Sequence, residues 1–86
     1  MSNIIAIHAN GKEFALSADE RRIITFLAAG YTNVDIARQF SVDASTISRR
    51  TARILEKLGV ANKLELILFA IHYGIVTRLK ERQAYG

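Results

Sequence analysis

Basic side chains recur at helical spacing between Asp43 and Leu58, in a stretch without proline. On a helix that turns about 100° per residue, one arc of this stretch is cationic and carries Thr46, Arg49, Arg50, Arg53 and Lys57. The opposite arc is mostly apolar and carries Ile47, Thr51, Ile54, Leu55 and Leu58. Guanidinium groups pair bidentately with phosphate oxygens or with O6 and N7 of guanine. The pattern therefore predicts a helix that packs through one face and binds a nucleic-acid duplex through the other.

The positive charge of the chain is concentrated in its second half. The 86 residues have a formal net charge of +4. Residues 1–43 hold four basic and five acidic side chains, a net charge of −1, whereas residues 44–86 hold eight basic and three acidic ones, a net charge of +5. Such asymmetry indicates a polyanionic partner, either nucleic acid or an anionic membrane, although a basic surface can also serve solubility alone.

Four helices with short connections are predicted to position the basic arc, within the ranges 17–30, 32–40, 43–58 and 62–74. Each range begins at a residue type that favours N-caps: Ser17, Thr32 or Asn33, Asp43 or Ser45, and Asn62. Glu20 and Glu65 complete two capping boxes. Only a few residues around positions 41–43 separate the second helix from the third, as in a helix-turn-helix, whose second helix lies in the major groove of DNA. This spacing favours double-stranded DNA over a merely solvated charged face.

Residues 1–15 are predicted to form an N-terminal arm or hairpin. The segment 4–9 is β-prone, Asn10-Gly11 suits a two-residue type I′ turn, and residues 14–16 return as a second strand. An isolated hairpin is only marginally stable in water, so it must pack on the helices or stay mobile. Residues 77–86 are predicted to be a basic C-terminal tail. The predicted fold class is therefore all-α, with four helices preceded by a short β-hairpin.

Four motifs follow one another in an order that is typical of one protein family. They are Leu16-Ser17-x-x-Glu20, Gly30-Tyr31-Thr32-Asn33-x-x-Ile36-Ala37, Val42-x-x-x-Thr46-Ile47 and Ile54-Leu55-x-Lys57-Leu58-Gly59-Val60-x-Asn62-Lys63-x-Glu65-Leu66. The ordered set, with its spacing, strongly resembles the LuxR-type (GerE-like) helix-turn-helix domain of bacterial transcription regulators. The resemblance covers residues 16–76, which is most of the chain.

The resemblance implies a four-helix domain that binds DNA half-sites as a dimer and pairs through its fourth helix. By position, it implies base contacts at Ser48, Arg49 and Ala52, with Arg53 adjacent, and phosphate contacts at Thr46, Arg50 and Lys57. Thr32 and Asn33 open the second helix, where free N–H groups can hold a phosphate. The family usually has Lys in place of Ser48, His in place of Arg50 and often Asn in place of Arg53. Because Ser48 and Ala52 are short, we expect Arg49 and Arg53 to carry specificity, with a preference for guanine.

The fourth predicted helix has two apolar stripes. We expect one stripe to face the core: Leu64, Ile67, Leu68 and Ile71. The other has more apolar surface than one small domain covers easily, and comprises Leu66, Phe69, Ala70 and Tyr73. Because exposed apolar patches often mark interfaces, we predict a twofold dimer through this second stripe. The alternative is that the N-terminal hairpin covers it.

No residue pattern indicates an enzyme, a metal site or a cofactor site. The chain has no cysteine, and His8 and His72 lack metal ligands at suitable spacing. The serines and threonines have no catalytic His–Asp partners, and Asp19 and Glu20 are interpreted as solvent-facing or cap residues. The longest apolar run, 66–71, has six residues, whereas a membrane span needs about twenty. The basic helix also lacks the Trp- or Phe-rich face of a membrane-surface helix.

These observations predict a stand-alone bacterial transcription regulator that binds double-stranded DNA as a homodimer, in the cytoplasm at the nucleoid. We expect no cofactor and no small-molecule ligand within the chain. Met1 lies only fifteen residues before the first motif, so we expect the receiver or ligand-binding domain of typical family members to be missing. One alternative is a modulator that heterodimerises with another regulator through the fourth helix and itself binds specific DNA weakly. Another is the promoter-reading last domain of a sigma factor.

Overall fold

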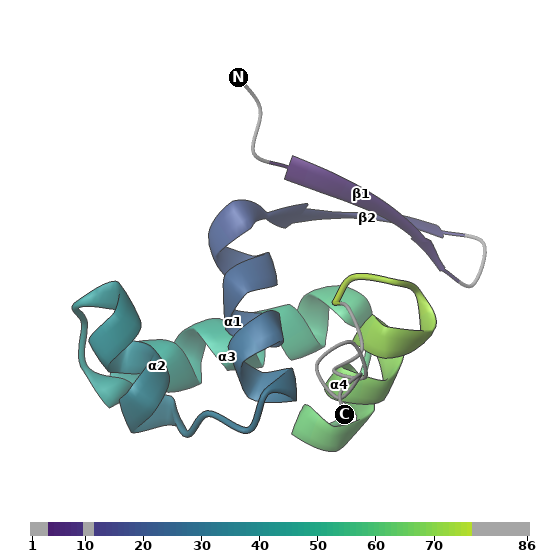
Figure 1. Cartoon of the computed structure of the whole chain (residues 1–86). Helices are drawn as coiled ribbons and strands as arrows, with labels where there is room; N and C mark the ends of the chain where they lie inside the picture. The colour runs from purple at the N-terminus through teal and green to yellow at the C-terminus, as the bar shows by residue number, and fades with distance from the viewer. Residues whose placement is uncertain (1–3, 10–11, 77–86) are drawn as a thin grey trace, which may run out of the picture.

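The computed structural model describes residues 4–9 and 12–76, which form a two-stranded sheet and four helices. In chain order these are β1 (Ile4–Ala9), β2 (Lys12–Ser17), α1 (Ala18–Ala28), α2 (Asn33–Phe40), α3 (Ala44–Leu58) and α4 (Lys63–His72), as Figure 1 shows. The predicted all-α architecture with a preceding hairpin is therefore confirmed. The predicted turn at residues 10–11 and the tail at residues 77–86 lie outside the described residues.

The hairpin runs directly into the helical domain. β1 and β2 are antiparallel, with Ile5 opposite Leu16 and Ile7 opposite Phe14. Ser17 is both the last residue of β2 and the N-cap of α1, so no loop separates the sheet from the helices. The Leu16 side chain is fully buried, and the Phe14 ring meets Phe69 of α4 edge to face, with 6.4 Å between ring centroids. These contacts supply the packing that an isolated hairpin lacks.

Side-chain caps begin every helix. Ser17 and Glu20 form the predicted capping box of α1, and the cap of α2 is Thr32 rather than Asn33. Thr32 forms a reciprocal capping box with Asp35, a box that the usual sequence pattern does not reveal because that pattern has Glu or Gln three residues after the cap. Asp43, not Ser45, caps α3.

The cap of α4 follows the prediction only in part. The Asn62 side chain accepts from the backbone N–H of Glu65, as expected. The Glu65 carboxylate, however, accepts from the backbone N–H of Ala61 at 2.8 Å instead of from Asn62, so the predicted second capping box is wrong. The extended backbone of Asn62 lets the carboxylate reach the N–H one residue earlier.

α2 and α3 form the helix-turn-helix unit. The three residues 41–43 join them, and Ser41 adopts a left-handed conformation with φ of 57°. The backbone N–H of Val42 donates to the Ala37 carbonyl at 3.0 Å, which closes the end of α2. The tight turn sets the direction in which α3 leaves α2.

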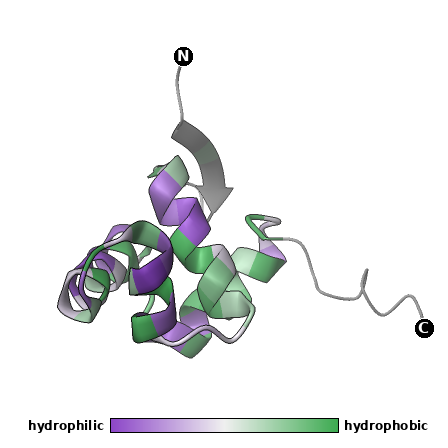
Figure 2. Cartoon of the chain, turned by 60° about the vertical axis from the view of Figure 1, so that its left-hand side comes forward, coloured by the Kyte–Doolittle hydropathy of each residue, from purple (hydrophilic) through white to green (hydrophobic). Residues whose placement is uncertain are grey.

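The core lies among the four helices and the base of the hairpin. Its fully buried large side chains come from β2 and all four helices: Leu16, Ile23, Ile24, Ile36, Ile47, Ile54 and Leu66. Figure 2 shows hydrophilic and hydrophobic residues side by side along the helices, and the described residues that are buried are apolar except for Thr51. None of the described helices is long and apolar enough to cross a membrane.

The structure reverses the two predicted faces of α4. Leu66 and Ala70, expected on the outer stripe, are 0% exposed, and Phe69 packs on Phe14 and on Tyr73. The expected inner stripe is the exposed one: Leu64 is 67% and Leu68 57% exposed, while Ile67 and Ile71 are partly buried. The helix α1 packs against α4 more extensively than either strand does, and the hairpin adds the contact of Phe14 with Phe69, so the hairpin covers only part of the second stripe. α4 is apolar nearly all round, so its periodicity does not select the buried face, and its neighbours do.

Candidate nucleic-acid interface

The helix α3 presents its cations to solvent on the side away from the core. Its buried residues are Ile47, Thr51, Ile54 and Leu58, the apolar arc that the sequence predicts with Leu55 half-buried beside it. Arg49, Arg50 and Arg53 are all exposed. Together with Thr46 and Ala52 they line one shallow surface pocket along α3. Five of the predicted DNA contacts thus share one surface.

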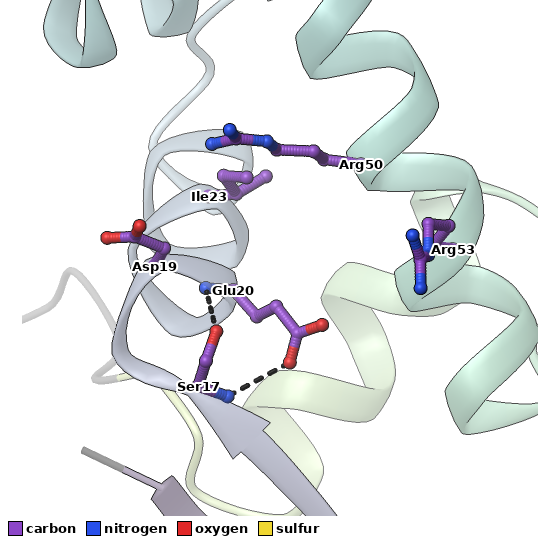
Figure 3. Close-up of a pocket in the computed structure, with 6 residues that line it drawn as sticks. All are labelled: Ser17, Asp19, Glu20, Ile23, Arg50 and Arg53. Atoms are coloured by element: carbon purple, nitrogen blue, oxygen red, sulfur yellow. Dashed lines mark hydrogen bonds between the residues drawn. The ribbon is translucent and has the colours of Figure 1, made fainter.

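The side chains of Arg50 and Arg53 on this surface have no partner among the described residues. Arg50 and Arg53 form no ion pair or side-chain hydrogen bond with any of them. In Figure 3, Arg50 extends from α3 over Ile23 toward α1. Both arginines line a groove between α1 and α3, whose other wall consists of Ser17 at the end of β2 and of Asp19, Glu20 and Ile23 in α1. Their N–H groups are therefore available to an incoming acceptor.

The Lys57 ammonium group is hydrogen-bonded and ion-paired within the protein. Its Nζ lies 2.7 Å from Glu20 Oε1 and 3.0 Å from Glu20 Oε2, and it donates to the Ala15 carbonyl at 3.0 Å. Burial raises the pKa of Glu20, but hydrogen bonds from Lys57 and from the Ser17 backbone, with the Lys57 charge, outweigh burial and hold that pKa below its ordinary value. Lys57 thereby joins α3, the start of α1 and β2.

Asn33 connects the start of α2 to α3. Its side-chain amide donates to the Ser48 hydroxyl at 3.0 Å, so Ser48 is engaged with α2 although its residue is exposed. The Asn33 Oδ1 atom is buried and has no hydrogen-bond partner among the described residues. Thr32, the neighbouring cap, exchanges two hydrogen bonds with Asp35, at 3.1 Å each.

Two carboxylates border this surface, although the sequence indicates them only as cap or solvent-facing residues. Asp19 lines the groove beside Arg50, and Asp43 sits at the start of α3, within reach of Thr46. Their position beside the arginines depends on the packing of α1 and α3, which no local pattern of the sequence shows. Among the described residues, no three His, Cys, Asp or Glu side chains gather as a metal site would require.

Comparison with protein families and solved structures gives one consistent result. The family model described as "Bacterial regulatory proteins, luxR family" matches residues 15–70. A solved structure of the transcription factor GerE is similar with a TM-score of 0.68 and 27% sequence identity. The similarity covers 72% of this chain and 92% of that one.

Curated relatives are similar over the same region. An uncharacterised transcriptional regulatory protein, YhcZ, of Bacillus subtilis is 30% identical over 64 residues, or 74% of this chain and 30% of its own length. The probable transcriptional regulatory protein SgaR of Hyphomicrobium methylovorum is 33% identical, over 71% of this chain and 28% of its own. The oxygen regulatory protein NreC of Staphylococcus aureus is 36% identical, over 65% of this chain and 26% of its own. The chain thus matches less than a third of each relative.

Proposed function

The chain belongs to the luxR family of bacterial regulatory proteins, and from this premise we propose that it binds specific double-stranded DNA as a homodimer. The family consists of transcription regulators, so the chain is a regulator domain and not an enzyme. In the proposed complex α3 lies in the major groove, which admits one α-helix. We place this activity in the bacterial cytoplasm, at the nucleoid.

The exposed basic face of α3 is the observation that supports this proposal most. Arg49, Arg50 and Arg53 project from one side of a helix whose other side is buried. A helix-turn-helix presents its second helix to the groove in this way. Arg50 and Arg53 also have no competing partner among the described residues, so binding DNA does not require an internal ion pair to break.

We assign the proposed contacts by reach and by free hydrogen-bonding groups. Arg49 and Arg53 are the proposed base readers, while Ser48 and Ala52 lie against bases through short side chains. Arg50 is the proposed phosphate contact of α3, and the start of α2 at Thr32 and Asn33 holds a second phosphate. Lys57, which the family resemblance places at a phosphate, would have to leave Glu20 to reach one.

The proposed dimer uses the exposed apolar face of α4. Leu64 and Leu68 are the large apolar residues of α4 that remain exposed in the described part of the chain. Pairing two such faces about a twofold axis removes them from water and matches the symmetry of two DNA half-sites. The original interface prediction, with Leu66 and Ala70, does not fit because both are buried within one subunit.

Selection from random duplexes tests the proposed function. We expect an enriched site that the purified chain binds about 10³-fold more tightly than a scrambled duplex, or better. Arg53→Ala should cost about 1–3 kcal/mol at one base pair, because one bidentate base contact is lost. Fluorescence anisotropy titration measures both effects.

Arg38→Ala is the matched control, because it removes an exposed arginine from α2 and should leave the base preference unchanged. Equal affinity for every duplex would refute sequence-specific binding by the chain. Enrichment that requires a second regulator would instead favour the modulator alternative, in which the α4 face pairs with a different chain.

A further inference from the structure

One carboxylate oxygen organises the first turn of α3. Asp43 Oδ1 accepts three hydrogen bonds: from the Thr46 backbone N–H at 3.0 Å, the Thr46 hydroxyl at 2.7 Å and the Ser45 hydroxyl at 3.1 Å. A simple N-cap needs only the first of these. The two hydroxyl bonds are additional and point both hydroxyl protons at Asp43.

The Thr46 hydroxyl then has only acceptor capacity left. A hydroxyl carries one proton and two lone pairs, and its proton is directed at Asp43 at the shorter distance. Arg49 Nη2 donates to the same oxygen at 3.3 Å. Carboxylate, hydroxyl and guanidinium therefore form a continuous chain from Asp43 through Thr46 to Arg49.

The electrostatics agree with this geometry. The hydroxyl and N–H of Thr46, then the Ser45 hydroxyl, and more weakly the positive charge of Arg49, lower the pKa of Asp43. At neutral pH the carboxyl group of Asp43 is therefore charged, and this charged form accepts the hydrogen bonds that connect it through Thr46 to Arg49.

We propose that Asp43 is a positioning residue for DNA recognition, which acts through the Thr46 hydroxyl to hold the Arg49 guanidinium in place for base contact. The inference rests on the proposed function, because it assigns a role in specificity. It separates Arg49 from Arg50 and Arg53, which have no such tether among the described residues. Preorganising a long side chain reduces the rotamer entropy lost on binding.

The same arrangement carries a cost in general affinity. Asp43 places a negative charge at the start of α3, where the helix N-terminus would otherwise attract phosphate. The Thr46 hydroxyl, with its proton directed at Asp43, is a poor phosphate donor. In the proposed role, Asp43 therefore lowers the affinity for DNA of any sequence, while it orients the Arg49 side chain for contact with one base.

Two substitutions at Asp43 separate orientation from charge. Asp43→Ser keeps a favoured N-cap but replaces the charged carboxylate by one neutral hydroxyl, which the Thr46 backbone N–H engages as the cap and which is a much weaker acceptor for the Thr46 hydroxyl. Asp43→Asn keeps an acceptor of the same shape and removes the charge. Circular dichroism and the melting temperature of each variant verify that α3 remains folded.

Base preference at the position read by Arg49 is the first measurement. Arg49→Ala should reduce this base preference about tenfold or more. Asp43→Ser should reduce the preference at the same base pair. The variant that combines both substitutions should show no larger loss than Arg49→Ala alone. Asp43→Asn should bind every duplex more tightly with the preference retained. The inference is overturned if Asp43→Ser leaves that preference intact, or if its effect adds to that of Arg49→Ala.

A second measurement needs no DNA and separates this inference from the proposed function. Nitrogen-15 relaxation of the arginine Nε atoms in the free protein should show Arg49 more ordered than Arg50 and Arg53. Asp43→Ser or Thr46→Val should remove that difference. If Arg49 is as mobile as the other two in the unmodified chain, Asp43 does not position it. If only the proposed function is wrong, the duplex measurements fail while the relaxation difference remains.

Discussion

The basic side chains of α3 differ in how firmly the protein holds them. Lys57 is fixed between Glu20 and the Ala15 carbonyl, Arg49 rests on Thr46, and Arg50 and Arg53 have no partner among the described residues. A helical wheel treats all four as equivalent cations. Their surroundings differ, because Lys57 joins α3 to α1 and β2, whereas the arginines are the side chains that we propose contact DNA.

The Glu20–Lys57 pair should make stability depend on pH. The folded state lowers the pKa of Glu20, so its stabilisation is complete above the unfolded value of about 4.3 and is lost as pH falls through the lower folded pKa. Glu20→Gln should therefore destabilise by about 1 kcal/mol at pH 7 and converge with the unmodified chain in acid. Urea unfolding between pH 7 and pH 3 measures the difference.

Glu56→Gln is the control for this comparison, since Glu56 is exposed and has no ion pair with another described residue. A pH dependence equal to that of Glu20→Gln would show that general charge repulsion, not the pair, controls acid stability.

Thr51 carries a hydroxyl that the core does not use. Its side chain is buried, and its Oγ1 has no hydrogen-bond partner in the described part of the chain. Thr51→Val keeps the shape and removes the unpaired group, so the free energy of unfolding should rise by about 1 kcal/mol. Denaturant unfolding measures this gain, and DNA affinity should not change because Thr51 faces away from the basic surface. A loss of stability would mean that the hydroxyl is paired in solution.

The helix α4 has two apolar sides, of which one is buried and the other is exposed to solvent. One side meets the core and the hairpin through Leu66, Ala70 and Phe69. The opposite side leaves Leu64 and Leu68 in solvent. Packing against α1, with Phe14 of the hairpin on Phe69, decides which side of α4 is buried, and the proposed dimer would cover the other side.

Matched leucine substitutions on α4 test this division. Leu68→Glu should convert a dimer to a monomer without loss of fold, because it places a charge on the exposed apolar face. Leu66→Ala should instead lower the free energy of unfolding by about 2–5 kcal/mol, because it opens a cavity in the core. Sedimentation equilibrium and thermal melting separate the two effects. A dimer that survives both Leu64→Glu and Leu68→Glu would place the interface elsewhere.

Over the whole molecule, the net charge of +4 is less informative than its placement. One of the four cations of α3 is neutralised by Glu20, and Asp19 and Asp43 border the surface that carries the others. Binding should therefore release fewer counterions than the number of basic residues suggests.

The salt dependence of DNA affinity tests this view. Arg50→Met should reduce the slope of log K against log salt by about one, because one phosphate contact is lost. Lys57→Met should leave the slope nearly unchanged and lower the melting temperature. Anisotropy titrations across salt concentrations give both slopes. An equal change in the two variants would show that Lys57 leaves Glu20 and reaches a phosphate.

The helices and the hairpin were predictable because local chemistry specifies them. Capping residues, glycines with positive φ near the ends of α1, α3 and α4, and a three-residue connection between α2 and α3 are all visible in the chain. The shared surface of Thr46, Arg49, Arg50, Ala52 and Arg53 follows from helical periodicity in the same way. The burial of α4 was not predictable, because a helix that is apolar nearly all round carries no directional signal.

The sequence by itself determined the approximate bounds of each helix and which face of α3 is basic, since caps and periodicity act within a few residues of the chain. Only the tertiary structure decided which cations are free to bind and which side of α4 is exposed. Those properties depend on contacts between residues distant in sequence: Lys57 with Glu20 and Ala15, and Phe14 with Phe69. Packing of the shared core brings these distant residues into contact, and a local sequence pattern does not predict such contacts.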